Sequence, residues 1–130
     1  MTTYNKLVSA VFITFSGNCK EALTYYQTCF GGKLHFELFE KQLPGYADLP
    51  VISGSLVADG ITIDGSDLTH NEGRIVGNYM AIFLRCENAD TRKELIEKLE
   101  FKKDNTPARN YNEKLIEITD TFEVRWVLYV

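Results

Sequence analysis

Apolar and polar positions follow the same order in two stretches of the chain. The run Leu7–Phe15 is dense in Val, Ile and Phe, as expected of a strand covered on both faces, and a helical pattern follows it. Later, Tyr79–Cys86 repeats the apolar run and is again followed by a helical pattern. The return of the Ala10–Phe30 pattern in Ala81–Leu99 predicts a duplicated unit, each copy beginning with a strand and a helix.

The first copy continues into strands. Asn18 can cap its helix, Glu21 stands where a capping box has an acid, and Gly31-Gly32 ends it. Ala22, Leu23, Tyr26 and Phe30 form the apolar stripe of this helix. Three strands are predicted, at Lys33–Lys41, Val51–Ala58 and Ile61–Asp64, with Asp59-Gly60 as a hairpin turn. Between the first two of them, a loop with two prolines carries Tyr46, which either closes over a ligand or packs against the sheet.

The second copy follows a polar stretch, 65–77. Asn88 or Asp90 can cap its helix, and Leu95, Ile96 and Leu99 form the buried stripe. Three strands are again expected: a poorly marked one between Phe101 and Ala108, then Lys114–Thr119 and Glu123–Val130. The predicted order is strand, helix and three strands, twice over.

Composition narrows the function classes. The 130 residues are 45% hydrophobic and 25% charged, as in an ordinary soluble protein, and the net charge of −4 argues against non-specific binding to nucleic acid. The run Leu7–Phe15 is too short to span a bilayer. Cys19, Cys29 and Cys86 are odd in number and lack metal-ligand spacing, and the first two stand at opposite ends of one predicted helix. Free thiols of this kind predict a cytoplasmic protein.

One segment resembles a known family. Phe12–Tyr26, followed by Phe30-Gly31-Gly32, resembles the opening of the PhnB-like branch of the vicinal oxygen chelate superfamily, which also contains glyoxalase I, bleomycin resistance proteins and extradiol dioxygenases. The resemblance extends through Gly54-Ser55-Leu56, Ser66-Asp67 and Thr119-Asp120 to Trp126. It implies an α+β fold, the glyoxalase/bleomycin resistance/dioxygenase fold, in which two tandem βαβββ modules have facing sheets that form a cup.

The same resemblance sets the domain boundaries. Residues 1–130 would be a single domain, made of a first module (1–68), a linker (69–77) and a second module (78–130), and usually assembled as a homodimer.

Family members that do chemistry typically hold a divalent metal in the cup, by a His or Gln in the first strand of each module and an acid in the last. Matching Asn18 with Asn88 puts these positions at Val11, Ala81, Asp64 and Leu128. Only Asp64 could be a ligand, and the two histidines, His35 and His70, lie elsewhere. One carboxylate alone is a poor site for a divalent ion, so no metal cofactor is predicted.

Strand alternation then predicts which side chains face the cup. They are mostly apolar, with a large aromatic, an acid and a base, as in small-molecule pockets. The candidate ligand-binding residues are Ile13, Phe15, Thr62, Asp64, Phe83, Arg85, Trp126 and Leu128. Trp126 could instead be a packing residue, and Asp64 and Arg85 could pair with each other or point into solvent. In a binding role, the guanidinium of Arg85 would hold an anionic group.

Two functional hypotheses remain. The first is metal-free binding of an apolar or aromatic small molecule in the cup, as in bleomycin resistance members. The second is a lyase- or dioxygenase-type enzyme that acts on a small molecule, with either a divalent metal or an acid–base pair such as Asp64 and Arg85.

Overall fold

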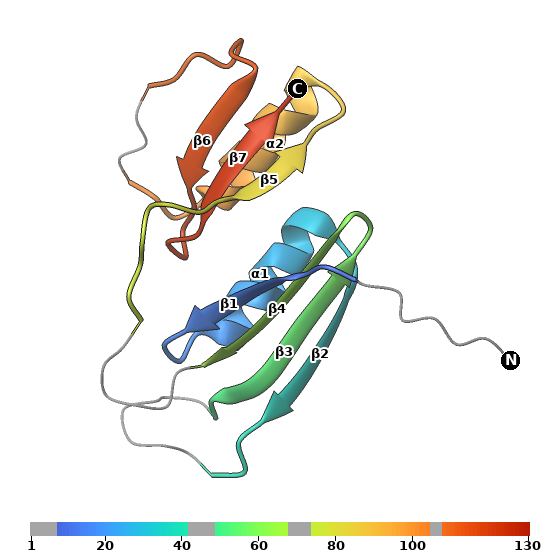
Figure 1. Cartoon of the computed structure of the whole chain (residues 1–130), viewed down its shortest axis with the longest axis vertical. Coiled ribbons are helices and arrows are strands. Elements are labelled where there is room, and N and C mark those ends of the chain that lie inside the picture. Colours follow the sequence, from blue (N-terminus) through green and yellow to red (C-terminus); the bar gives the residue numbers. More distant parts are fainter. Residues whose placement is uncertain (1–7, 42–48, 68–73, 105–107) are drawn as a thin grey trace, which may run out of the picture. The chain divides into compact units, whose positions relative to one another are not determined.

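The structure is a computed structural model that describes residues 8–41, 49–67, 74–104 and 108–130. The chain divides into two compact units, Met1–Arg74 and Ile75–Val130, and each has a helix and a sheet of its own (Figure 1). The mixed α+β architecture of two sheets and two helices agrees with the predicted fold class. Tyr46 and His70 lie outside the described residues.

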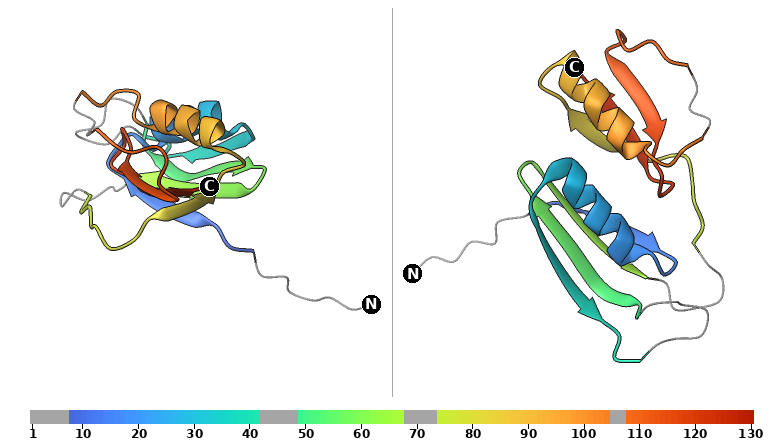
Figure 2. Two further views of the ribbon diagram at one scale, coloured as in Figure 1. Left: turned by 90° about the horizontal axis from the view of Figure 1, so that it is seen from above. Right: turned by 180° about the vertical axis from the view of Figure 1, so that it is seen from behind.

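Unit 1 contains one helix and four strands. The helix α1 (Cys19–Phe30) follows β1 (Val11–Phe15) and precedes β2 (Lys33–Leu38), β3 (Val51–Ala58) and β4 (Ile61–Asp67). The strand order is β1-β4-β3-β2, in which β1 runs parallel to β4 and the other neighbours are antiparallel. This is the predicted βαβββ order, and α1 covers one face of the sheet (Figure 2).

The helix lies very close to the sheet at Gly54 of β3. A Cβ atom added to Gly54 would be 2.9 Å from Cδ1 of Leu23 and 3.1 Å from the ring of Phe36. The absence of a side chain therefore lets α1 approach, and the buried stripe of α1 packs there: Cys19, Ala22, Leu23 and Tyr26. Three of these four belong to the apolar stripe that the sequence predicted.

The N-terminus of α1 is held by a residue distant in sequence. The side chain of Asn18 makes no capping hydrogen bond. Instead, Oδ1 of Asp67 accepts hydrogen bonds from the backbone N–H groups of Gly17 (2.8 Å) and Cys19 (3.0 Å), and Oδ2 accepts one from Val51 (2.8 Å). The helix begins where the sequence predicted, but the predicted capping side chain is wrong because the end of β4 supplies a charged acceptor to the same place.

Unit 2 contains one helix and three strands in its described residues. The strands are β5 (Ile82–Arg85), β6 (Leu115–Thr119) and β7 (Arg125–Tyr129), in the order β5-β7-β6, and α2 (Ala89–Leu99) lies between β5 and β6 in sequence. The side chain of Asn88 accepts a hydrogen bond from N–H of Thr91 at 2.8 Å, so Asn88 caps α2. Within 101–108, the described residues contain no strand, and 105–107 lie outside the description.

A buried arginine of α2 fastens the sheet to the chain that precedes β6. Arg92 is 2% exposed, and its guanidinium donates hydrogen bonds to the carbonyl oxygens of Tyr111 (2.7 Å), Lys114 (2.9 Å) and Leu128 (3.5 Å). Its Nε atom has no partner among the described residues. In the sequence, Glu94, Glu97 and Glu100 lie among Arg92 and the other basic residues, a pattern that predicts a solvated helix face, and for Arg92 this prediction is wrong.

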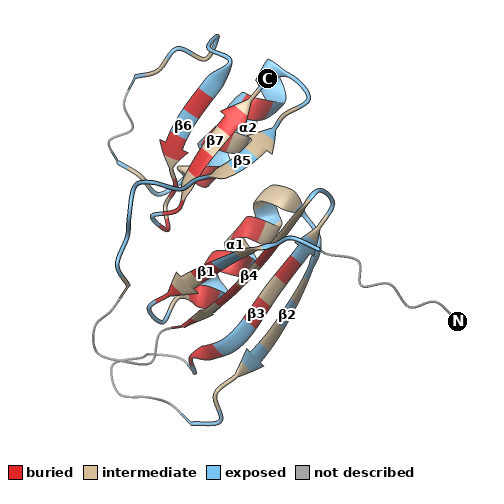
Figure 3. Ribbon diagram, in the orientation of Figure 1, coloured by how far each residue is buried: buried red, intermediate tan, exposed pale blue. Residues whose placement is uncertain are grey.

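Burial alternates along the strands of both units (Figure 3). In unit 2, one face carries the buried residues Ile116, Ile118, Trp126 and Leu128, and the opposite face carries exposed or half-buried ones. The helix α2 covers one face of this sheet (Figure 2), and the buried residues of α2 include Ile96 and Leu99. The hydrophobic core of unit 2 therefore lies between α2 and the Trp126 face.

Helices in the described ranges fall short of the length and apolar character that a membrane span needs.

Candidate functional site

The predicted binding residues of unit 1 lie on two different faces. Register pairs Val11 with Ile63, Ile13 with Gly65 and Phe15 with Asp67, so these residues share a face. A Cβ atom at Gly65 would be 3.2 Å from the ring of Phe15 and 3.3 Å from Sγ of Cys19 in α1. Ile13 and Phe15 are therefore buried core residues on the helix-covered face.

Thr62 and Asp64 lie on the opposite, uncovered face. Phe12 of β1 pairs with Asp64, and Asp64 pairs in turn with Ser55 of β3. Phe12 is 64% exposed, and Thr62 and Asp64 are half-buried. His35 of β2 pairs with Ser55, so one row across this open face reads Phe12, Asp64, Ser55 and His35.

The predicted residues of unit 2 divide in the same way. Trp126 and Leu128 are fully buried, and they pair with Ile82 and Leu84 of β5 on one side and with Ile118 and Ile116 of β6 on the other. Phe83 and Arg85 pair with Val127 and Tyr129 on the uncovered face. Of the eight candidates, four are thus core residues, namely Ile13, Phe15, Trp126 and Leu128, and four lie on uncovered faces, namely Thr62, Asp64, Phe83 and Arg85.

A one-residue difference between the two units explains why the candidates of β1 are buried and those of β5 are not. The helix-facing Phe15 stands four positions before the first helical residue, Cys19, whereas the helix-facing Leu84 stands five positions before Ala89. Matching the helix starts therefore pairs Phe15 with Arg85, although these side chains point to opposite faces of their sheets. A shift of one residue in a strand exchanges its two faces.

The uncovered face of unit 2 has an aromatic centre. The rings of Phe83 and Tyr129 lie 6.2 Å apart, and the guanidinium carbon of Arg85 lies 5.2 Å from the centroid of Tyr129. Phe83 is 53% exposed, and Arg85 has no carboxylate partner among the described residues of unit 2. We call Phe83, Arg85 and Tyr129 the aromatic triad. Sequence analysis missed Tyr129, because it assigned the other face of β7, with Trp126 and Leu128, to the cup.

Arg125 borders the aromatic triad on the same face of β7. It forms an ion pair with Glu117 of β6 and donates hydrogen bonds to the carbonyl oxygens of Asn78 and Met80 (3.2 Å for Met80). Because its donors are directed to these groups, Arg125 acts mainly as a tie between β7 and the chain that leads into β5. Arg85 is the guanidinium on this face that remains available to a ligand.

The residues present do not fit a divalent metal. Among the described residues, no three His, Cys, Asp or Glu side chains lie close enough together to bind a metal ion. The two first-strand positions that the family resemblance implies are Val11 and Ala81, which offer no ligand atom. We therefore derive no chemical step through a metal.

The cysteines show no sign of activation. Burial, and to a smaller extent the nearby carboxylate of Asp67, raise the pKa of the Cys19 thiol from 9.0 to about 12. Burial also raises the pKa of Cys86, with Arg92 acting in the opposite direction. A thiol with a raised pKa is a poor nucleophile at neutral pH, so these two residues are structural.

Comparison with known proteins identifies the fold. No protein-family model matches the chain, and no curated protein matches its sequence. Solved structures do match, and they show that the chain has the fold of the vicinal oxygen chelate superfamily, as the resemblance of its opening segment predicted.

Three of these structures come from bacteria. The PhnB protein from Bacillus cereus is 19% identical, with 93% of this chain and 97% of that chain covered and a TM-score of 0.73. Protein PA1353 from Pseudomonas aeruginosa is 24% identical, with 95% and 97% covered and a TM-score of 0.72. The fosfomycin resistance protein FosX from Mesorhizobium loti is 11% identical, with 97% and 92% covered and a TM-score of 0.61. Identities this low establish the fold and leave the activity open.

Proposed function

We propose that this protein binds a small apolar or aromatic molecule through the uncovered face of the sheet of unit 2, without a metal. The observation that carries the proposal is the aromatic triad, in which Phe83 is largely exposed and the Arg85 guanidinium stacks on Tyr129 without a carboxylate partner in its unit. Exposed aromatic rings cost free energy in water, and a bound ring or alkyl group would recover part of it.

The uncovered face of unit 1 carries two further candidate residues of its own. Thr62 supplies a hydroxyl and Asp64 a carboxylate, and both are half-buried. Mostly apolar surfaces with a few polar groups that fix orientation are typical of small-molecule sites. In this proposal, the apolar part of the ligand contacts Phe83 and Tyr129, and the guanidinium of Arg85 orients it.

A chemical-shift titration of the full-length, isotope-labelled protein with a set of small aromatic and aliphatic compounds tests this proposal. We expect at least one compound to shift the side-chain resonances of Phe83, Arg85 and Tyr129 together. Phe83→Ala should weaken that binding about five- to thirtyfold, since a buried aromatic contact contributes on the order of 1–2 kcal/mol. Phe101→Ala is the matched control, because Phe101 is also an exposed phenylalanine of unit 2 but lies after α2.

Absence of any shift at the triad across the whole compound set, with the protein folded, would reject the proposal. Tryptophan fluorescence is a weaker assay here, because Trp126 is fully buried on the opposite face of its sheet from Phe83.

Assembly and location belong to the same proposal. The resemblance to the superfamily supports a homodimer, which sedimentation of the purified protein would test. The free thiols of Cys19, Cys29 and Cys86 are compatible with a reducing cytoplasm.

A further inference from the structure

The two sheets differ by one strand at the same edge. In unit 1, β4 pairs in parallel with β1, β3 pairs with β4, and β2 completes the sheet. In unit 2, β7 pairs in parallel with β5, β6 pairs with β7, and the sheet of the described residues ends there. The outer edge of β6 is therefore the place that corresponds to β2.

Backbone hydrogen bonds establish which groups of β6 point outward. N–H of Val130 donates to the carbonyl of Lys114 (3.2 Å), and N–H of Asp120 donates to the carbonyl of Val124 (2.8 Å). In an antiparallel pair, the backbone N–H and C=O groups of successive residues point alternately toward the partner strand and away from it. The backbone groups of Ile116 and Ile118 thus point toward β7. Those of Leu115, Glu117 and Thr119 point outward.

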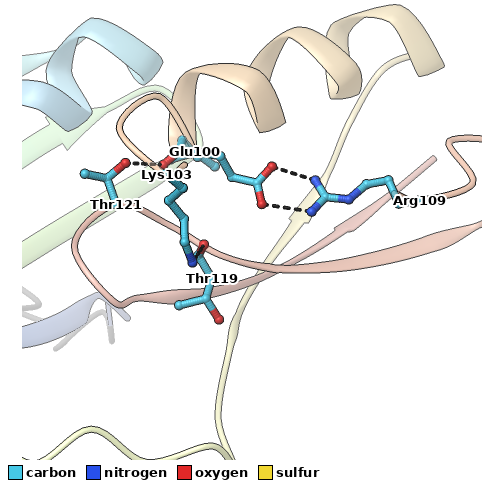
Figure 4. A network of polar contacts seen from close by, with 6 residues as sticks. Glu100, Lys103, Arg109, Thr119 and Thr121 are labelled. Carbon is cyan, nitrogen blue, oxygen red and sulfur yellow. Dashed lines mark hydrogen bonds and ion pairs between the residues drawn. The ribbon is translucent and has the colours of Figure 1, made fainter. Parts of the chain in front are cut away.

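At the Thr119 end of this edge, the outward carbonyl group already has a hydrogen-bond partner. The ammonium group of Lys103 donates to the carbonyl oxygen of Thr119 at 2.8 Å (Figure 4). That bond confirms that the carbonyl of Thr119 points away from β7. Within the described part of the chain, the backbone N–H and C=O groups of Leu115 and Glu117 have no hydrogen-bond partner.

A hollow of about 310 Å³ lies against the open part of the edge. It is lined by Ala108, Arg109, Asn110, Glu113, Leu115, Ile116 and Glu117. The segment 108–113 runs on the side of β6 that faces away from β7 (Figures 1 and 2). The volume is at the small end of the range for ligand pockets, and the edge from Leu115 to Glu117 is about 7 Å long, which matches about three residues of extended chain.

Hydrogen bonds fix the segment 108–113, which forms the wall of the hollow beside β6. Arg109 makes two hydrogen bonds to the carboxylate of Glu100, at 2.7 and 2.8 Å, and both side chains are largely buried (Figure 4). The guanidinium of Arg92 holds the carbonyl oxygens of Tyr111 and Lys114. The segment is thus anchored before a partner arrives, which lowers the entropy cost of binding.

We propose that the outer edge of β6 binds a short extended peptide segment by strand addition. The backbone of Leu115 and Glu117 pairs with the peptide in the position that β2 takes in unit 1. This site is separate from the aromatic triad, because it uses main-chain groups at the edge of the sheet.

Charge indicates which peptide fits. Glu100 is neutralised by Arg109 and Glu117 by Arg125, whereas Glu113 is exposed and has no ion pair among the described residues. A Lys or Arg side chain of the peptide would pair with Glu113. A second copy of the chain fits less well, since the segment 108–113 flanks the edge and a symmetric β6 pairing would bring two Glu117 side chains together.

The test uses the full chain labelled with ¹⁵N and the capped pentapeptide acetyl-Val-Lys-Val-Lys-Val-amide. We expect the amide resonances of Leu115 and Glu117 to shift, and their hydrogen exchange to slow, more than those of Ile116 and Ile118, which already bond to β7. The same peptide with alternate backbone nitrogens methylated should not bind. A peptide with Glu in place of Lys should bind more weakly.

Three variants of the protein sharpen the test. Leu115→Pro removes an outward N–H without removing a bond to β7, and it should weaken peptide binding about two- to tenfold. Glu113→Gln should weaken binding of the lysine peptide about two- to fivefold, and Glu87→Gln, an exposed acid before α2, should not.

Three results would overturn the proposal: binding that alternate methylation leaves intact, shifts that avoid Leu115 and Glu117, or shifts at these two residues that follow protein concentration and indicate self-association. If Leu115→Pro does not fold, the methylated peptide with the unmodified protein decides the question.

Discussion

The carboxylate of Asp120, in the turn between β6 and β7, accepts hydrogen bonds from three donors. Oδ2 accepts from Nε1 of Trp126 at 2.7 Å, and Oδ1 accepts from the backbone N–H groups of Phe122 (2.7 Å) and Val124 (3.0 Å). Both Asp120 and Trp126 are fully buried. The only tryptophan of the chain is thereby oriented by a carboxylate six residues away and packs in the core of unit 2.

Asp120→Ala should therefore destabilise the protein by about 3 kcal/mol, because it leaves the indole N–H and two backbone N–H groups without acceptors in a buried place. Denaturant unfolding measures this change. Glu123→Ala, in the same turn but exposed, should cost less than about 1 kcal/mol. Equal losses for the two variants would contradict this assignment of the carboxylate.

Cys19 gives the stability a dependence on alkaline pH. Its pKa is 9.0 for an ordinary thiol and about 12 in the folded chain, so above pH 9 the unfolded chain loses a proton that the folded chain keeps. Stability from this source is complete below pH 9 and is lost as the pH rises towards 12. The unfolding free energy of the native protein should fall relative to that of Cys19→Ala by about 1 kcal/mol near pH 10.5, and parallel curves from pH 8 to 11 would refute this.

Among the elements, α1 depends on a cap that its own sequence does not contain. Asp67 stands at the end of β4, and its carboxylate takes up N–H groups of Gly17, Cys19 and Val51. The cap thus joins the helix, the end of β4 and the start of β3. Local sequence patterns cannot reveal such a contact, because it forms only when β1 and β4 are paired.

Asp67→Ala should cost about 2–4 kcal/mol and Asn18→Ala less than about 1 kcal/mol, since the carboxylate of Asp67 accepts backbone hydrogen bonds at the helix N-terminus and the side chain of Asn18 does not. Hydrogen exchange of the first-turn amides of α1, together with denaturant unfolding, measures both. A larger effect at Asn18 than at Asp67 would restore the cap that the sequence suggested.

Elements with strong periodic patterns could be predicted from the sequence. Val51–Ala58 is β3 to the residue, and both helices begin directly after the proposed asparagines. The strand expected between Phe101 and Ala108 was wrong for its described residues, because a polar stretch with little alternation gives no face to bury. Matching the helix starts gave β1 and β5 the same face, and one extra residue between β5 and α2 was enough to make that match wrong.

For the molecule as a whole, the resemblance to a superfamily predicted the fold, while the binding surface required the register of the strands. Phe83 and Arg85 could be proposed from alternation in β5, whereas Tyr129 needed the pairing of β5 with β7. The hollow beside β6 could not be foreseen, since it depends on how Arg92 and Arg109 hold the preceding segment.

The whole chain should not depend on a divalent metal for its stability. Val11 and Ala81 offer no ligand atoms, and Asp64 alone cannot compete with water for an ion. We expect thermal melting to change by less than about 2 °C when zinc, nickel, iron(II) or manganese is added, because binding only to the native state would raise the melting temperature. Elemental analysis of protein purified without a chelator should find no stoichiometric metal, and a one-to-one content would refute the prediction.

The position of Trp126 has a practical consequence for spectroscopy. The chain has a single indole, and it reports from the interior of unit 2, so its emission follows the unfolding of that unit. A melting curve read by this fluorophore alone gives the transition of unit 2 and does not establish whether the sheet and helix of unit 1 unfold at the same temperature. Circular dichroism, which sees both helices, is the probe that would reveal such a hidden step.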